Sequence, residues 1–294
     1  MGVRGQDPAD GHTIDGGLQH PESVAYDAEN DVFYAANIGK KLAPTSKDGD
    51  GFISRLAVDG TVDSLRFLPR SGSDVTLHAP KGTVVMDGRL YTADVDRVVG
   101  FDLETGETVT EISLEDDGVS FLNDITIVDD QTLFASATSQ GSIYRVDLEE
   151  ETASALDLSI SGVNGVVYAR EAEVLYAVNF GGDQGGQLWT VEFGADGSVM
   201  DTRSRMVKKG GRFDGIVLRP NDTVLISDWG VETAEKTTPA LHRVTLGEGG
   251  AITTIDLPEW QGPADFTCAE TYGCWIPDLP GGTVEIVRPG DRTN

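Results

Sequence analysis

A short polar motif followed by an apolar segment recurs six times along the chain, and this repeat limits the fold more than any other feature. Each apolar segment leads into a turn rich in Asp, Asn or Gly and then into a second apolar segment. The six motifs are Pro21-Glu22-Ser23-Val24, Pro80-Lys81-Gly82-Thr83, Leu122-Asn123-Asp124-Ile125, Val163-Asn164-Gly165-Val166, Phe213-Asp214-Gly215-Ile216 and Ala264-Asp265-Phe266-Thr267. The steps between their second residues range from 41 residues (Asn123 to Asn164) to 59 residues (Glu22 to Lys81). A period of about 40–50 residues is typical of a closed ring of similar β units.

The other apolar segments of each repeat have the character of strands. Third segments follow at residues 51–56, 98–103, 142–148, 187–193, 241–246 and 283–287, and they are alternating or fully apolar. Hairpin turns are indicated at Asp59-Gly60, Thr105-Gly106 and Asp196-Gly197. No segment of useful length has helical periodicity. The sequence therefore predicts an all-β chain, a six-bladed β-propeller with four-stranded blades that forms one domain over residues 1–294.

The sixth repeat ends after three strands, at Pro289. A closed ring needs a fourth strand in that blade, because an open blade would leave strand edges unpaired. A segment near His12 to Gly17 is in the right place to supply it. We therefore predict that an N-terminal strand closes the last blade.

The charge of the chain limits its partners. The net charge of −27 arises from 49 acidic and 22 basic residues, and such a surface repels phosphate backbones and anionic lipid. No window approaches the roughly 18 consecutive apolar residues of a membrane span. We therefore expect a small-molecule substrate as the partner and neither nucleic acid nor a membrane span. The composition leaves the oligomeric state open.

The chain has two cysteines, Cys268 and Cys274, at a spacing that suits a short hairpin. We predict a disulfide between them, with a pair of free thiols as the alternative. A disulfide favours a periplasmic or secreted protein over a cytoplasmic one. Residues 1–17 lack the apolar stretch of a secretory signal, so the sequence leaves the compartment open.

The polar residues of the six motifs form a candidate site. The first strand of a propeller blade lines the central channel, so we expect Glu22, Lys81, Asn123, Asn164, Asp214 and Asp265 to form a ring around the axis. Carboxylates packed so closely repel one another, and a divalent cation removes that conflict. Carboxylate and amide oxygens favour Ca²⁺, with Zn²⁺, Mn²⁺ and Mg²⁺ as alternatives. We predict one cation held by Glu22, Asn123, Asn164 and Asp214, with Lys81 paired to Asp265. The alternative is that these Asn, Asp and Gly residues only form turns.

The motifs around Glu22, Asn123, Asn164 and Asp214 resemble those of the senescence marker protein/gluconolactonase/luciferin-regenerating-enzyme-like family of six-bladed propellers. The resemblance spans nearly the whole chain and includes the order of the four residues. It implies that a Glu, two Asn and an Asp from separate blades bind a catalytic divalent metal. Members of the family hydrolyse lactones, and the diisopropyl fluorophosphatase and paraoxonase relatives hydrolyse organophosphorus esters.

The chain also departs from that family pattern. Val163 stands where the family often has Pro, and Ser23 stands where paraoxonase-like proteins have an Asp for a second calcium. Lys81 and Asp265 lie outside the four-residue pattern, so the resemblance assigns them no role.

These observations predict a metal-dependent hydrolase of a lactone or related ester at the channel mouth. Asp214, or Asp265 beside it, is the candidate general base or nucleophile, and Lys81 is the third candidate catalytic residue. The alternatives are a non-catalytic ligand- or protein-binding propeller with a structural metal, and a metal-dependent lyase. Asp94, Asn179 and Asp228 end second strands and are candidates for substrate contact.

Overall fold

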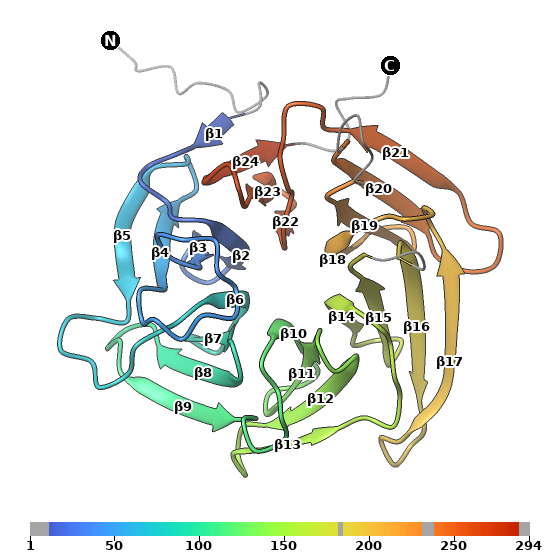
Figure 1. Ribbon diagram of the computed structural model, residues 1–294, viewed down its shortest axis with the longest axis horizontal. Coiled ribbons are helices and arrows are strands. Elements are labelled where there is room, and N and C mark those ends of the chain that lie inside the picture. The colour runs from blue at the N-terminus through green and yellow to red at the C-terminus, as the bar shows by residue number, and fades with distance from the viewer. Residues whose placement is uncertain (1–11, 182–184, 231–237, 288–294) are drawn as a thin grey trace.

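The fold is a ring of six antiparallel sheets around a central axis (Figure 1). The computed structural model describes residues 12–181, 185–230 and 238–287, and no helix occurs among them. Each sheet has four strands, so the predicted all-β, six-bladed propeller with four-stranded blades is confirmed. The prediction of one domain over residues 1–294 remains a prediction, because residues 1–11 and 288–294 lie outside the described part.

The strands of a blade follow one another in the chain, from the axis outward, in the first five blades. The first three blades are β2 (Pro21–Asp27), β3 (Val32–Asn37), β4 (Phe52–Ala57), β5 (Val62–Leu68); β6 (Pro80–Met86), β7 (Arg89–Asp94), β8 (Arg97–Asp102), β9 (Thr108–Ser113); and β10 (Leu122–Ile127), β11 (Thr132–Ala137), β12 (Ser142–Asp147), β13 (Thr152–Ala155). The next two are β14 (Val163–Ala169), β15 (Val174–Asn179), β16 (Gln187–Phe193), β17 (Val199–Met206); and β18 (Phe213–Arg219), β19 (Thr223–Asp228), β20 (Ala240–Thr245), β21 (Ile252–Asp256).

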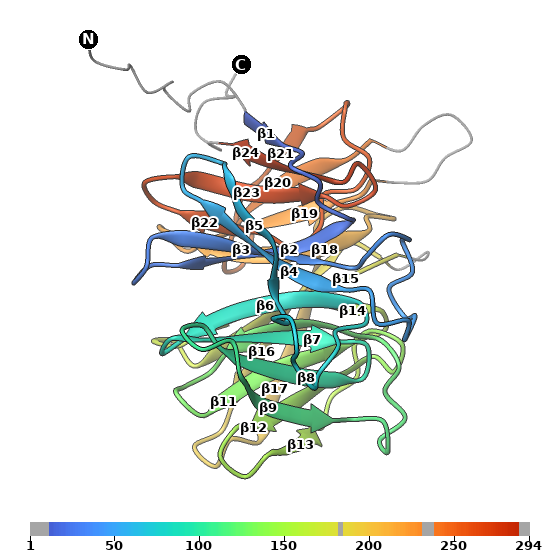
Figure 2. The same ribbon diagram turned by 90° about the vertical axis from the view of Figure 1, so that its left-hand side faces the viewer.

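Blade 6 joins the two ends of the described chain. It has β22 (Thr267–Ala269), β23 (Gly273–Asp278) and β24 (Thr283–Val287), and its outermost strand is β1 (His12–Ile14). β1 pairs with β24 in the register His12 to Ile286 and Ile14 to Val284. The two strands lie side by side in both views of the ring (Figures 1 and 2). The predicted closure by an N-terminal strand is therefore confirmed.

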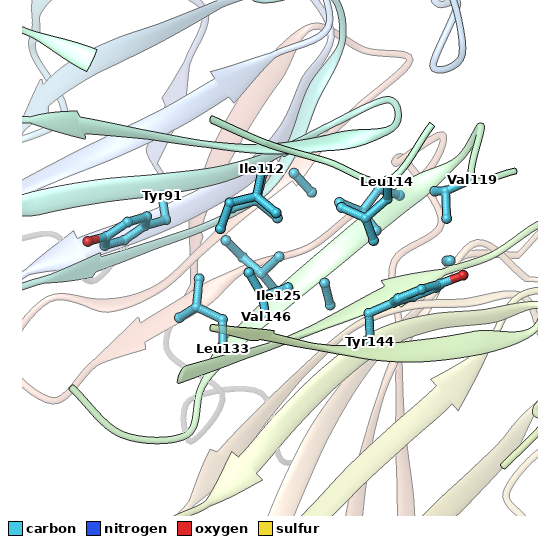
Figure 3. Close-up of a cluster of buried hydrophobic side chains, with 13 residues drawn as sticks. Tyr91, Ile112, Leu114, Val119, Ile125, Leu133, Tyr144 and Val146 are labelled. Atoms are coloured by element: carbon cyan, nitrogen blue, oxygen red, sulfur yellow. The ribbon is translucent and has the colours of Figure 1, made fainter. Parts of the chain in front are cut away.

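Apolar side chains fill the space between neighbouring blades. Tyr91 and Ile112 of blade 2 pack against Ile125, Leu133 and Val146 of blade 3 in one buried cluster (Figure 3). These residues alternate along their strands with residues of the other face, which is the pattern of stacked sheets. At the closure, the rings of Phe33 in blade 1 and Trp275 in blade 6 stack with their centroids 3.8 Å apart. The last blade is thus packed against the first.

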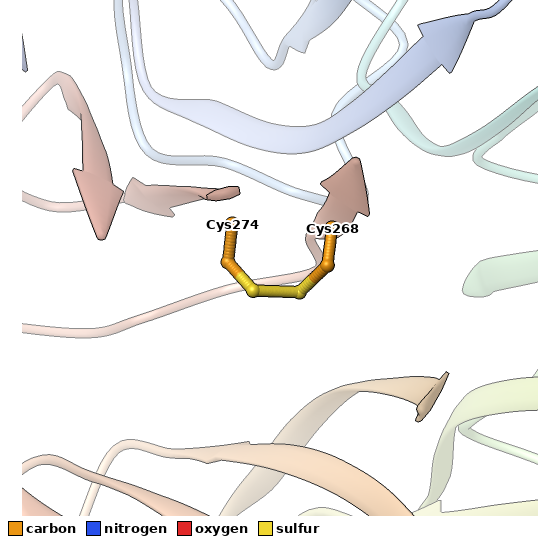
Figure 4. Close-up of a disulfide and its surroundings, with 2 residues drawn as sticks. All are labelled: Cys268 and Cys274. Atoms are coloured by element: carbon orange, nitrogen blue, oxygen red, sulfur yellow. A yellow bond between two sulfur atoms is a disulfide. The ribbon is translucent and has the colours of Figure 1, made fainter. Parts of the chain in front are cut away.

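Cys268 and Cys274 form a disulfide between β22 and β23 (Figure 4). The two residues are directly opposite each other in the antiparallel register. The predicted disulfide is therefore confirmed. Cys268 belongs to β22, which at three residues is the shortest of the six innermost strands.

Candidate functional site at the propeller axis

A β-bulge at the start of the inner strands places the predicted ring residues. In β18, Phe213 pairs with Asp228 and Ile216 pairs with Ile226, so the register shifts by one residue across Asp214 and Gly215. The same shift occurs across Glu22 in β2 and across the equivalent motifs of β6, β10 and β14. A bulge takes a residue out of the ladder and re-aims its side chain. The repeated bulge explains why these polar residues share one layer.

Blade 6 departs from the predicted ring by one residue. Pro263 pairs with Asp278 as Phe213 pairs with Asp228, so Ala264 occupies the position of Asp214. The backbone confirms this equivalence. The carbonyl of Ala264 accepts from Ser227 Oγ at 3.0 Å, as the carbonyl of Asn164 accepts from Ser136 Oγ at 2.6 Å. The prediction that Asp265 belongs to the same ring is therefore wrong.

The axis carries two polar layers instead of one ring. The first layer consists of Glu22, Lys81, Asn123, Asn164, Asp214 and the apolar Ala264. The second consists of the residues that follow them, namely Ser23, Gly82, Asp124, Gly165, Gly215 and Asp265. Three glycines allow the inner strands to approach one another. A Cβ on Gly82 would lie 2.5 Å from the Cα of Asp124, and one on Gly215 would lie 2.7 Å from the Cα of Asp265.

Three oxygens of the first layer are buried without a hydrogen-bond partner. They are Glu22 Oε2, Asn164 Oδ1 and Asp214 Oδ1. The other carboxylate oxygen of Asp214 accepts a hydrogen bond of 2.8 Å from Trp229 Nε1. Buried polar atoms are nearly always partnered, so three unpartnered acceptors in one layer fit the binding of an electropositive group.

The carboxyl groups at the axis are hard to ionise together. Burial, followed by the nearby charge of Asp265, raises the pKa of Asp214 to about 7, while hydrogen bonds from Trp229 and Asn164 oppose the shift. Burial also raises the pKa of Asp265 to about 7 against a 2.9 Å hydrogen bond from Ser23 Oγ.

The remaining two acids behave in the same way. Burial, with Asp214 and Asp265, raises the pKa of Glu22 well above its ordinary value, and Lys81 opposes this rise. The pKa of Asp124 is raised by burial and by Asp265, although its carboxylate accepts from the backbone N–H groups of Ile125 and Val166. Among the described residues, three buried acids and the half-buried Asp265 thus face a single buried lysine, an imbalance that a bound cation relieves.

Lys81 does not pair with Asp265, contrary to the sequence prediction. Its ammonium group donates to the carbonyls of Ala79 (2.8 Å) and Pro44 (3.2 Å). Burial lowers the pKa of Lys81, and the charges of Glu22, Asp94 and Asp96 oppose that shift. Lys81 is therefore an internal counter-charge for Glu22 that also touches the loop between β3 and β4.

The acids that end the second strands brace loops. Asp94 Oδ1 accepts from the backbone N–H groups of His78 and Ala79 at 2.9 and 2.8 Å. Asp228 Oδ1 accepts likewise from Arg212 and Gly230 at 2.9 and 2.8 Å. Both carboxylates are fully buried in these contacts. The prediction of substrate contact by Asp94 and Asp228 is therefore wrong, and Asn179 has the same bracing role toward the N–H of Gln187.

The channel continues past the second layer as a cavity of about 240 Å³. Asp124 and Asp265 line it together with apolar residues that include Val24 and Ile216. A polar cavity of this size can hold water. Asp265 therefore lies between the buried first layer and this cavity.

Within the described residues, no group of three or more His, Cys, Asp or Glu side chains is arranged to hold a metal ion. The predicted set instead combines two carboxylates, Glu22 and Asp214, with the amides of Asn123 and Asn164. Such all-oxygen sets suit hard cations. The orphaned oxygens of Glu22, Asn164 and Asp214 fit that use.

The fold and the axial acids define a six-bladed β-propeller with a buried, acidic polar cluster on its axis. No family model and no curated protein matches the chain. Solved structures do match it, among them a luciferin-regenerating enzyme with TM-score 0.65 and 10% identity, covering 97% of this chain and 91% of the other.

Two further matches have the same fold. Regucalcin from Agrobacterium tumefaciens strain C58, described as a calcium-binding protein, has TM-score 0.63 and 17% identity, covering 95% of this chain and 93% of the other. A streptogramin B lyase has TM-score 0.61 and 13% identity, covering 94% and 96%. At such identities these matches show the fold alone.

No helix long and apolar enough to cross a bilayer occurs in the part of the chain that the structure describes.

Proposed function

We propose that the protein is a divalent-metal-dependent hydrolase of a lactone or related ester, with Ca²⁺ as the metal. The observation that carries this proposal is the set of three buried, unpartnered oxygens on Glu22, Asn164 and Asp214. Together with Asn123 from the same layer, they would hold the cation. When bound, the cation supplies positive charge that polarises the carbonyl oxygen of the substrate.

The acids of the chain supply the proton chemistry. Asp214 has a pKa of about 7, lies in the first layer, and is oriented by the indole N–H of Trp229. It accepts a proton from water as the water oxygen bonds to the carbonyl carbon of the ester. The C–O bond of the ester then breaks, and the proton passes to the leaving alkoxide. Asp265, on the cavity side of that layer, is the alternative base, and the charge of Lys81 opposes the rise in the pKa of Glu22.

The known proteins with this fold are consistent with the proposal. One is described as a calcium-binding protein and another as a luciferin-regenerating enzyme. A streptogramin B lyase shares the fold as well, and this supports a metal-dependent lyase as the second candidate. The products separate the two, because elimination leaves an unsaturated product and adds no water.

The test combines metal analysis with a substrate screen. Purified wild-type protein, Asp214→Ala and the matched control Asp256→Ala are analysed for bound metal. Asp256 is an exposed acid of β21 in the same blade as Asp214. The same three proteins are assayed with lactones, aryl esters and phosphotriesters, with chelator and after Ca²⁺ is restored.

We expect wild type and Asp256→Ala to bind one Ca²⁺ and to hydrolyse a lactone, with activity lost on chelation and restored by Ca²⁺. Asp214→Ala should lose both metal and activity. Full metal content in Asp214→Ala would refute the ligand assignment. Retained metal with no turnover in wild type would favour a non-catalytic propeller with a structural metal.

The disulfide between Cys268 and Cys274 supports an oxidising compartment, so we propose a periplasmic or secreted protein, with the cytoplasm as the alternative.

A further inference from the structure

Six residues hold equivalent positions directly after the second strand of each blade, at the end of the axis where the inner strands begin, and we call this end the mouth. We call them the collar: Ile38, Val95, Thr138, Phe180, Trp229 and Leu279. Their equivalence is visible in the backbone, because five of them donate an N–H to the carbonyl that lies just before the polar motif of the blade. These bonds are Ile38 to His20 (3.1 Å), Thr138 to Phe121 (2.9 Å), Phe180 to Gly162 (2.8 Å), Trp229 to Arg212 (3.0 Å) and Leu279 to Gly262 (3.0 Å). Five of the six collar side chains are apolar.

The collar lies directly on the first polar layer. The last residue of a second strand pairs with the first residue of the inner strand, as Asp228 pairs with Phe213. The collar and the first polar layer therefore lie at the same end of the blades. Ile38, Val95 and Leu279 form one apolar cluster with Ala264, which belongs to that layer. Trp229 joins the cluster and also touches Asp214 through its indole N–H. A ligand that reaches the axial oxygens from the mouth therefore passes the collar.

Only part of the collar is available to a ligand. Ile38 and Val95 are 2% exposed and Leu279 is 5% exposed, so these three are used in packing. Phe180 and Trp229 remain partly exposed, and their rings meet edge to face with centroids 5.5 Å apart. The accessible apolar surface thus lies over blades 4 and 5.

From this arrangement we infer that the substrate carries an apolar substituent, alkyl or aryl, beside its ester group, and that Phe180 and Trp229 bind this substituent. The inference rests on the proposed hydrolase function and names its substrate class. An aromatic pair gains affinity by covering alkyl or aryl surface, by about four-fold per buried methylene. Ring hydroxyls in the same place would lose their water, and each one left unpaired weakens binding by roughly ten-fold. A polyhydroxylated sugar lactone is therefore the wrong substrate for this mouth.

The test compares lactones that share one six-membered ring. One series bears linear alkyl groups of two to eight carbons, and one compound bears hydroxyls on each ring carbon. Wild type, Phe180→Ala and the control Met200→Ala are assayed. Met200 is a 66% exposed residue of β17 in the same blade, so its truncation removes apolar surface away from the mouth.

In wild type and Met200→Ala, kcat/KM should rise about four-fold per methylene over the first carbons, and the hydroxylated lactone should be at least 100-fold poorer than the hexyl lactone. Phe180→Ala should flatten this chain-length dependence. A hydroxylated lactone that is hydrolysed as fast as the hexyl lactone, or an unchanged slope in Phe180→Ala, would overturn the inference.

Binding of alkyl lactams, which resist hydrolysis, separates this inference from the proposed function. Calorimetry is used to measure their affinity for the same three proteins. Chain-length-dependent binding that is lost in Phe180→Ala, with no lactone turnover at all, would leave the apolar site standing and overturn the hydrolase. Turnover of lactones, together with lactam affinities that do not depend on chain length, would overturn the apolar site and leave the hydrolase standing.

Discussion

The indole N–H of Trp229 donates a 2.8 Å hydrogen bond to Asp214 Oδ2, while Asp214 Oδ1 is buried with no partner. The two residues are 15 positions apart in the chain. Trp229 itself follows Asp228, whose carboxylate braces the entry to β18 through the N–H of Arg212. The inner strand and the end of the second strand thus fix one oxygen of the acid and leave the other available.

Replacing Trp229 with Phe tests whether this contact supports a metal site. The change keeps an aromatic ring and removes only the donor, so Ca²⁺ affinity should fall by about ten-fold or more. Calorimetric titration with Ca²⁺ is the measurement. Trp189→Phe is the matched control, because Trp189 Nε1 is one of the described buried atoms without a hydrogen-bond partner. Equal affinities in the two variants would remove Trp229 from the site.

The raised pKa values predict how metal-free stability depends on pH. Asp214 and Asp265 have folded-state pKa values of about 7 against an ordinary 3.8, so the fold favours their protonated forms. That contribution to stability is fully present below pH 3.8 and is lost as the pH rises through about 7. In chelator, the melting temperature should therefore fall between about pH 5 and pH 8.

The double variant Asp214→Asn/Asp265→Asn separates these two groups from the general repulsion of a chain with net charge −27. Its melting temperature should depend less on pH than that of wild type over the same range. Added Ca²⁺ should stabilise wild type more at pH 8 than at pH 5, since Asp214 must ionise to bind it. A wild-type profile parallel to that of the double variant would contradict the assignment.

Asp228→Ala should destabilise blade 5. The buried carboxylate accepts hydrogen bonds from Lys208 Nζ (2.9 Å) and from the backbone of Arg212 and Gly230, and it contacts His242 Nε2 at 3.0 Å. Against the cost of burial, the contacts with His242 and Lys208 lower the pKa of Asp228 to about 2. Removing one member of such a buried network costs about 3 kcal/mol.

Urea unfolding of Asp228→Ala measures that loss, with the exposed Asp256→Ala in the same blade as control. A change below about 0.5 kcal/mol in Asp228→Ala would show that the network contributes little to stability.

The disulfide should stabilise the folded state by restricting the unfolded chain. Its two cysteines are six residues apart, and closing so short a loop contributes about 2 kcal/mol. Reductant should lower the free energy of unfolding of wild type by that amount and leave Cys268→Ala/Cys274→Ala unchanged. Wild type that unfolds identically with and without reductant would show that the cross-link does not limit the unfolded chain.

Much of the fold was predictable from the sequence because its signals are local. Each strand carries its own alternation, each turn its own Asp, Asn or Gly, and the unit repeats six times. The sixth repeat runs out after three strands, at Pro289, and this pointed to a segment near His12 to Gly17, where β1 (His12–Ile14) does pair with β24.

The candidate site was predictable in part for the same reason. Glu22, Asn123, Asn164 and Asp214 occupy one layer because they hold the same place in similar motifs. Asp265 was misplaced by one residue, because Ala264-Asp265-Phe266 looks like Phe213-Asp214-Gly215 when aligned on the acid. The pairing of Pro263 with Asp278 sets the register, and pairing is a property of two strands.

By itself, the sequence determined the number of blades, the order of the strands and the polar residues that start them, because repeat length and alternation are written along the chain. Only the tertiary structure decided that Lys81 binds the carbonyls of Ala79 and Pro44, that Trp229 holds Asp214, and that four acids share one desolvated axis. Those relationships depend on register, bulges and distance between blades, which no single segment encodes.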